Sequence, residues 1–168
     1  MTPKELSKLI KTKYPEQICK AINDTFAKYN INTPLRQRHF LAQIFHESGG
    51  LIYTTELSTG AQYENRKDLG NIYPGDGRKY KGRGFIQITG RFNYEKLSKD
   101  FGIDFINTPE KLAQNPFNML SAGWFWNLKK LNNWADKNNI EKITRLINGG
   151  LNGFEDRKKW FTKISCVI

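Results

Sequence analysis

The chain has 168 residues, which fits one domain and leaves little room for a second. Hydrophobic residues make up 38% and aromatic residues 13% of the sequence, enough to build a buried core, so wholesale disorder is excluded. The 27 Lys and Arg residues outnumber the 16 Asp and Glu residues and leave a net charge of +11. This charge predicts attraction to a polyanion, which can be nucleic acid, an anionic membrane face or an anionic cell-wall polymer.

The cysteines and the N-terminus bear on the cellular compartment. Cys19 and Cys166 make neither a disulfide framework nor a Cys-x-x-Cys pair, which is typical of a protein made in a reducing compartment. No apolar run approaches the ~20 residues of a membrane span. The segment Met1–Glu5 lacks the basic and then apolar pattern of a signal peptide, so we expect synthesis in the cytoplasm.

Four positions carry the same helix-start signal, in which a capping residue precedes a proline at the first helical position. They are Thr2-Pro3, Thr33-Pro34, Thr108-Pro109 and Asn115-Pro116. At the first of them, Glu5 follows Thr2 by three residues and completes a capping box.

Apolar residues at helical spacing and glycines at the ends divide the chain further. Gly49 and Gly102 are predicted to end helices. The stretch 51–83 is rich in glycine and lacks a helical period, which predicts loops with a short hairpin. We therefore expect one mainly α domain over residues 1–168, with a loop-rich centre and no linker. The helical spacing involves Leu6, Leu9 and Ile10; Ile18, Ile22 and Phe26; Leu35, Leu41, Ile44 and Phe45; Tyr94, Leu97 and Phe101; and Leu120 with Trp124.

Histidine chemistry has little support in the sequence. His46 precedes Glu47, but a zinc-protease helix needs a second histidine where Gly50 stands. His39 is the only other histidine, and two histidines with two distant cysteines do not form a closed metal site. We expect both histidines to be packed or hydrogen-bonded, and we expect no metal and no cofactor.

Two glutamates are better candidates for chemistry. Glu47 lies at the predicted end of the helix that begins after Thr33, and its helical neighbours are Ile44 and Gln43, with Phe40 one turn further back. Apolar surroundings disfavour the charged form of a carboxyl group, which suits a general acid. If the turn after Glu47 reverses the chain, Glu56 faces Glu47 across a groove, as in an acid–base glycosidase. Two glutamates at this spacing are also common on ordinary surfaces.

Two polar, glycine-rich segments follow these glutamates. They are 80–90, followed by Asn93 and Tyr94, and 147–153. Glycines let a backbone approach a ligand closely, and Gln, Thr, Asn and Tyr side chains supply donors and acceptors for sugar hydroxyl and acetamido groups. Each segment alone is equally compatible with an ordinary turn.

Three segments together resemble the signature blocks of glycoside hydrolase family 19, which includes chitinases and phage endolysins that degrade peptidoglycan. They are Phe45-His46-Glu47-Ser48-Gly49-Gly50, the run from Tyr80 to Thr89, and Ile147-Asn148-Gly149-Gly150. The resemblance covers approximately residues 30–160 and implies a mainly α, lysozyme-like fold with two lobes flanking a groove. It also implies an inverting mechanism without a covalent intermediate. The small size and basicity resemble the endolysin branch of the family.

The resemblance assigns roles to individual residues. Glu47 matches the general acid, Glu56 the general base, and Thr89 the hydroxyl residue that helps hold the nucleophilic water. The predicted substrate-binding residues are Tyr80, Arg83, Gln87, Asn93, Tyr94 and Asn148.

The sequence departs from the family pattern at two places. In plant chitinases the second glutamate lies further along a longer insertion, so Glu64 remains a rival to Glu56. Those enzymes also carry a glutamate after the Asn-Gly-Gly-Leu segment, where this chain has Asn152. This departure weakens the carry-over of the family's buried Glu–Arg network to Arg157.

The expected partners are peptidoglycan glycan strands. Arg78, Lys79, Lys81 and Arg83 lie beside the proposed groove, and electrostatic contact with an anionic envelope would follow from the charge. Trp124 is expected in the core rather than on a sugar platform. We expect a monomer that reaches the cell wall after release from the cytoplasm through a holin pore.

The sequence leaves four alternative functions open. A lytic transglycosylase needs only one glutamate and releases 1,6-anhydro sugars, and a chitinase would cut chitin instead of cell walls. A basic nucleic-acid-binding protein lacks a recognition motif here and leaves the three blocks unexplained. The fourth alternative, a catalytically dead wall-binding module, would cause no loss of turbidity in a cell suspension.

Overall fold

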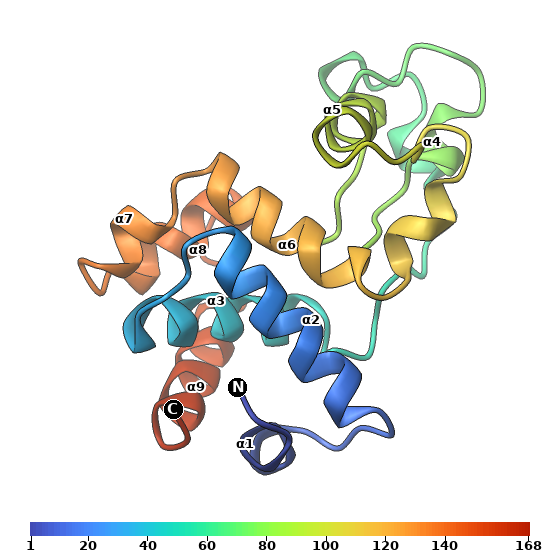
Figure 1. The fold of residues 1–168 in the computed structure, drawn as a ribbon. Coiled ribbons are helices and arrows are strands. Elements are labelled where there is room, and N and C mark those ends of the chain that lie inside the picture. Colours follow the sequence, from blue (N-terminus) through green and yellow to red (C-terminus); the bar gives the residue numbers. More distant parts are fainter.

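The computed structural model describes all residues, 1–168, and contains nine α-helices and three short 3₁₀-helices but no β-strand (Figure 1). The mainly α fold predicted from the sequence is therefore confirmed. The helices are α1 (Pro3–Leu9), α2 (Pro15–Lys28), α3 (Pro34–Glu47), η1 (Ala61–Tyr63), η2 (Lys67–Leu69), α4 (Asp76–Lys79), α5 (Arg91–Phe101), η3 (Pro109–Ala113), α6 (Phe117–Leu128), α7 (Asn132–Ala135), α8 (Ile140–Asn148) and α9 (Phe154–Ser165).

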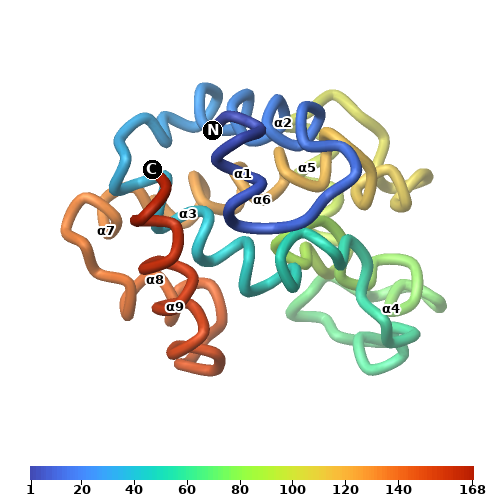
Figure 2. Tube along the Cα trace, turned by 90° about the horizontal axis from the view of Figure 1, so that it is seen from below, coloured from blue at the N-terminus to red at the C-terminus, as the bar shows by residue number.

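The helices divide into two lobes (Figure 1). The larger lobe contains α1, α2, α3, α7, α8 and α9, and the smaller lobe contains α4, α5 and the loops around them. Helix α6 packs against α2 and leads from one lobe toward the other. Seen from below, α3 runs between α2 on one side and α8 and α9 on the other (Figure 2).

The two predicted N-caps of the larger lobe form as the sequence indicates. The Thr2 hydroxyl accepts a hydrogen bond from the Glu5 N–H, and the Glu5 carboxylate accepts one from the Thr2 N–H, so the capping box is complete. The Thr33 hydroxyl accepts from the Arg36 N–H at the start of α3. These caps satisfy backbone donors that a helix start leaves unpaired.

The other two start signals are only partly correct. Thr108-Pro109 begins the 3₁₀-helix η3, and the Thr108 side chain makes no capping hydrogen bond. At Asn115-Pro116 the proline is itself the N-cap residue, and α6 begins one residue later at Phe117. The predicted helix ends agree with the structure. Helix α3 ends at Glu47, just before Gly49, and Gly102 closes α5 in the left-handed conformation.

Helix α3 is the central element of the core. All seven residues from His39 to Phe45 are buried, because other helices cover α3 on several sides. The Phe40 ring packs edge-on against Phe26 of α2 and Trp126 of α6, with ring centroids 5.9 and 5.4 Å away. Trp124 is 5% exposed, as predicted for a core residue. A helix packed in this way gives a rigid base to the residues at its C-terminal end.

The smaller lobe is held together mainly by hydrogen bonds in its loops. The predicted hairpin is absent, and only two isolated bridges form, Thr55 with Arg83 and Arg83 with Ile88. The almost fully buried Asp76 accepts hydrogen bonds from the N–H groups of Ile72 and Tyr73 and pairs with Arg91. This single carboxylate therefore closes the 72–76 loop onto the start of α5.

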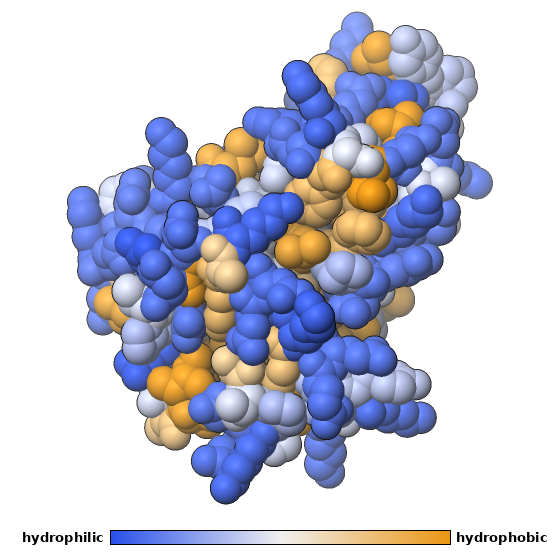
Figure 3. Space-filling view, viewed as in Figure 1, coloured by the Kyte–Doolittle hydropathy of each residue, from blue (hydrophilic) through white to orange (hydrophobic).

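The surface is mostly hydrophilic on the face shown in Figure 3, with apolar side chains gathered in small patches. None of the helices combines the length and the apolar character needed to cross a lipid bilayer.

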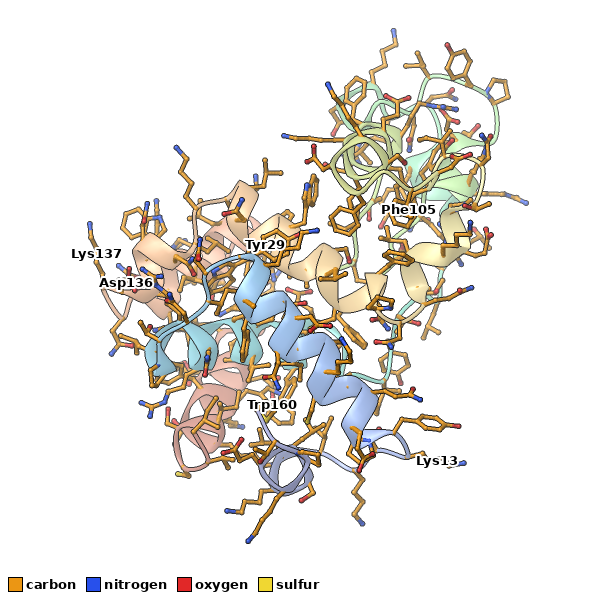
Figure 4. The ribbon with its side chains drawn as sticks, in the orientation of Figure 1. Lys13, Tyr29, Phe105, Asp136, Lys137 and Trp160 are labelled. Atoms are coloured by element: carbon orange, nitrogen blue, oxygen red, sulfur yellow. The ribbon has the colours of Figure 1, made fainter.

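In Figure 4, Trp160 lies between α1 and the core helices, and Asp136 lies at α7, where it pairs with Arg36 of α3.

Candidate active site

Glu47 is the last residue of α3, and its carboxylate is held by a buried arginine. Its Oε1 accepts a hydrogen bond of 2.5 Å from Nη2 of Arg157 on α9. Arg157 is fully buried, and its Nη1 donates to Oε1 of Gln43, one turn before Glu47 on α3. The side chain of Glu47 keeps 22% of its surface exposed. The carboxylate is therefore fixed against the larger lobe while part of it stays accessible.

This arrangement corrects the expected surroundings of Glu47. Phe40 and Ile44 are fully buried, as their helical spacing suggests, but they belong to the core behind the carboxylate. The carboxylate itself contacts the Arg157 guanidinium, 110 residues away in the sequence, rather than an apolar wall. Helix spacing identifies the neighbours along α3 but gives no information about α9.

The turn after Glu47 forms as predicted. Gly49 and Gly50 both have positive φ, and the Gly50 N–H donates to the Phe45 carbonyl at 2.7 Å. The chain then crosses to the smaller lobe, where the Glu56 N–H donates to the Gly82 carbonyl and the Gly84 N–H donates to the Thr54 carbonyl. The two glutamates thus belong to different lobes and are joined by a short segment.

The Glu56 carboxylate is surrounded by hydrogen-bond donors. Its Oε1 accepts from the Ser58 hydroxyl, the Gln62 amide and the Tyr63 hydroxyl at 2.7 to 3.0 Å, and its Oε2 accepts from the Gly82 N–H at 3.0 Å. Burial alone would raise the pKa of Glu56, but the hydrogen bonds from Ser58, Gly82 and Tyr63 outweigh it and hold the pKa below the ordinary value. Glu56 is therefore ionised at neutral pH and able to accept a proton.

Glu64, the rival to Glu56, has both oxygens committed to a turn. Its Oε1 accepts from the Gly75 N–H at 2.6 Å, and its Oε2 accepts from the Gly77 N–H at 2.9 Å. A side chain at Gly77 would collide with Glu64, because a Cβ there would lie 2.5 Å from the Glu64 nitrogen. The carboxylate of Glu64 therefore closes the 75–77 turn, whereas the donors to Glu56 come from the 58–63 segment and from Gly82.

Three predicted site residues of the smaller lobe lie together. Gln87 has φ +57° and donates from Nε2 to the Gly84 carbonyl. The Thr89 hydroxyl donates to the Gln87 carbonyl, and the Asn93 amide donates to the Thr89 carbonyl. All three side chains are partly exposed, so the turn presents a row of amide and hydroxyl groups. We call Gln87, Thr89 and Asn93 the polar row.

Two residues predicted to bind substrate are buried and cannot contact it. Tyr80 and Tyr94 are fully buried, with ring centroids 5.1 Å apart. Burial raises the pKa of Tyr94 to about 12, and its hydroxyl donates to the Lys81 carbonyl. Arg83 donates to that hydroxyl and to the Lys79 carbonyl. These residues brace the loop behind the polar row, because a segment without helical or strand period gives no indication of which side chains face inward.

Asn148 lies on the other lobe. It is the last residue of α8, is exposed, and donates from Nδ2 to the Asn152 carbonyl across the turn into α9. Figure 2 shows this α8–α9 turn on the same side of α3 as α4 and its loops. Asn148 is therefore not in the polar row of the smaller lobe.

The histidines have structural partners. His39 is buried against Phe161, and its Nε2 lies 2.8 Å from Oδ1 of Asn138. Nδ1 of His46 lies 2.7 Å from the carboxylate of Asp156 on α9. Nowhere do three or more His, Cys, Asp or Glu side chains lie close enough to hold a metal ion.

Sequence reasoning missed several residues of the site. Gln43 was expected as a helical neighbour of Glu47 from its spacing of four residues, but its contact with Arg157 was not. Ser58, Gln62 and Tyr63 carry no such signal, because the loop that brings them to Glu56 has no regular period.

Comparison with known proteins places the chain in a family. A family model described as chitinase class I matches residues 39–141, which include both Glu47 and Glu56. A Haemophilus influenzae protein described as containing a glycosyl hydrolase family 19 domain is 35% identical over 176 residues, covering 86% of each chain. The chain belongs to glycoside hydrolase family 19. Chitinase 4 of rice is 33% identical over 122 residues, covering 67% of this chain but only 39% of its own length.

Solved structures share the fold at lower sequence identity. Chitinase C from Streptomyces griseus superimposes with a TM-score of 0.77 at 23% identity, covering 99% of this chain and 74% of that one. A class IV chitinase from Zea mays gives a TM-score of 0.74 at 18% identity, covering 98% and 89%. The family 19 chain is thus a glycoside hydrolase with the helical fold of these chitinases.

Proposed function

We propose that this family 19 hydrolase cleaves β-1,4-glycosidic bonds of bacterial peptidoglycan by an inverting acid–base mechanism. Glu47 gives a proton to the leaving glycosidic oxygen, and Glu56 takes a proton from a water whose oxygen attacks the anomeric carbon. The Thr89 hydroxyl helps to orient that water. Inversion requires room for the water, so the two carboxyl groups lie ~6.5–9.5 Å apart when substrate is bound.

The observation that carries this proposal is the environment of Glu56. Four donors surround its carboxylate and fix its position, and those from Ser58, Gly82 and Tyr63 hold its pKa below the ordinary value, so Glu56 is in the ionised form in which a general base accepts a proton. A lytic transglycosylase needs only one carboxylic acid, so a second carboxylate prepared in this way favours hydrolysis. Arg157 occupies Oε1 of Glu47, so in this proposal the other carboxyl oxygen carries the proton that goes to the leaving oxygen.

Charge favours peptidoglycan over chitin as the polymer. The net charge of +11 suits a polymer whose peptides carry carboxylates, whereas chitin is neutral. Arg78 and Lys79 of α4 are exposed close to the loop that contacts Glu56. We further propose that the enzyme acts as a monomer on the cell wall after leaving the cytoplasm.

Chitin hydrolysis is the second candidate, and the names of the relatives favour it. Rice chitinase 4 and the Streptomyces griseus enzyme are both described as chitinases. Chitin and peptidoglycan share β-1,4-linked N-acetylglucosamine, so the same pair of carboxylates would serve either polymer.

The experiment that decides between them is a parallel digestion of purified sacculi and colloidal chitin, with mass spectrometry of the soluble products. We expect muropeptides with ordinary reducing ends from the sacculi, released more slowly as salt rises. Products with 1,6-anhydro ends would show that the enzyme is a lytic transglycosylase and not a hydrolase. Release from chitin alone would make the enzyme a chitinase.

A further inference from the structure

A pocket lies outside the candidate active site, between α2 and α6. It has a volume of about 250 Å³ and is formed by the start of α2, the start of α6, Phe85 and the segment 51–54 that leads from Glu47 to Glu56. In Figure 4, Lys13 marks the α1–α2 loop beside which this pocket opens. No residue assigned to acid–base chemistry or to the polar row lines it. We call it the α2–α6 pocket.

The lining of the α2–α6 pocket is mixed and uncharged. Apolar surface comes from α2, from α6 and from the 51–54 segment, and the polar groups are hydroxyls and amides only. A neighbouring hollow of about 210 Å³ shares part of this lining, and its two charged residues, Lys20 and Asp24, pair with each other at 2.6 Å. The polar residues of the pocket are Thr12, Gln17, Thr54, Asn115 and Asn118.

One polar group of the pocket has no partner. Asn118 is 8% exposed, and its buried Oδ1 accepts no hydrogen bond. A buried acceptor without a partner costs free energy, so such a group calls for an explanation, and a bound donor is one. At the rim of the same pocket, the Tyr14 side chain is 61% exposed although it is aromatic.

We propose that the α2–α6 pocket binds an N-acetylated hexosamine unit of the glycan, apart from the site of cleavage. The acetamido N–H of the sugar donates to Oδ1 of Asn118, and its methyl group packs on Ile18 and Met119. The sugar ring stacks on Tyr14, and the hydroxyl and amide side chains receive its hydroxyl groups.

Size and charge support a sugar as the occupant. The volume lies below the roughly 300–1,000 Å³ of pockets for drug-sized ligands, which suits a single sugar unit. A stem peptide would bring carboxylates, and the pocket offers them no free cationic side chain. Because Leu51 and Thr54 line the pocket and precede Glu56, a glycan bound here is held close to the catalytic segment.

The first test is an NMR titration of the ¹⁵N-labelled full chain with N-acetylglucosamine, which has no glycosidic bond to be cut. We expect saturable shifts of the backbone amides in 12–21 and 115–119, and at least about tenfold weaker binding of glucose, which lacks the acetamido group. Equal responses to the two sugars, no shifts in these segments, or shifts there caused only by a stem peptide would overturn the proposal.

The second test uses Asn118→Ala and Tyr14→Ala, with Tyr73→Ala as the control at an exposed aromatic residue of the other lobe. Both pocket variants should bind N-acetylglucosamine about three- to tenfold more weakly, and the control should bind normally. Stability of Asn118→Ala should not fall, because the Asn118 oxygen has no hydrogen bond to lose. Lower stability with unchanged sugar binding would make the role of Asn118 structural and overturn the proposal.

The sugar titration is independent of the choice of polymer. N-acetylglucosamine occurs in both peptidoglycan and chitin, so failure of the enzyme to cut sacculi leaves the expected binding unchanged. Absence of sugar binding at the α2–α6 pocket, together with normal cleavage of sacculi, would refute the proposal for this pocket and leave the proposed function intact.

Discussion

The two lobes hold their carboxylates in different ways. Glu47 ends a helix whose preceding residues are buried, and it is paired with Arg157, itself fully buried in the same lobe. Glu56 lies in a loop and is held by four donors of the smaller lobe. Core packing and one buried arginine position the proposed acid, whereas hydrogen bonds from loop residues position the proposed base and hold its pKa below the ordinary value. Changes in the two lobes should therefore affect different measurable properties.

Removing the acid should have the largest effect on activity. We expect Glu47→Gln to lower the rate of wall hydrolysis on the order of 10²–10⁴-fold, because the amide cannot protonate the leaving oxygen. The rate is measured by turbidity loss of sacculi well below the melting temperature. Glu16→Gln, at an exposed residue in the first turn of α2, is the matched control. Near-normal rates for Glu47→Gln would refute its assignment as the acid.

Comparing Glu56→Gln with Glu64→Gln distinguishes a catalytic role from a structural one. Glu56→Gln should lower the rate by about 10²-fold or more and remove the acid limb of the pH profile. Glu64→Gln should retain most of the rate but lower the free energy of unfolding by about 1–3 kcal/mol, because its carboxylate closes the 75–77 turn. The opposite pattern would mean that the base is Glu64.

The Arg157 pair tests how the larger lobe holds the acid. We expect Arg157→Met to lower the free energy of unfolding by about 2–4 kcal/mol, because Gln43 and Glu47 both lose a buried donor. Lys159→Met, at an exposed residue of the same helix, should change it little. The measurement is urea unfolding followed by circular dichroism. Equal stabilities of the two variants would contradict the packing account of this lobe.

A smaller effect should appear in the pH profile when one donor to Glu56 is removed. Tyr63→Phe deletes a hydrogen bond to the ionised form, so the pKa of Glu56 rises and the acid limb of kcat/KM moves to higher pH. The stability that Glu56 contributes above its unfolded pKa, and that is lost as pH falls through the folded value, decreases as well. Tyr73→Phe should leave the limb in place. A shift to lower pH would contradict the assigned environment.

Local patterns in the sequence predicted the larger lobe better than the smaller one. The Thr33 cap, the buried face of α3 and the Gly49-Gly50 turn all depend on near neighbours, so they could be read from the sequence. The contact between Glu47 and Arg157 joins residues 110 apart, and no periodicity encodes it.

In the smaller lobe, the predicted site residues were only partly placed by the sequence. Gln87, Thr89 and Asn93, which the resemblance assigns to the site, lie together. Tyr80 and Tyr94 were expected on the surface but are buried, since a loop without a regular period does not reveal its inner side.

The central claim is that Glu56 activates water for direct attack from the opposite side to Glu47. The most direct test is ¹H NMR of freshly cut glycan, recorded before the new reducing ends equilibrate. Inversion at a β-1,4 bond predicts that the α-anomer appears first. Initial appearance of the β-anomer would show retention of configuration and would contradict the roles given to Glu56 and Thr89.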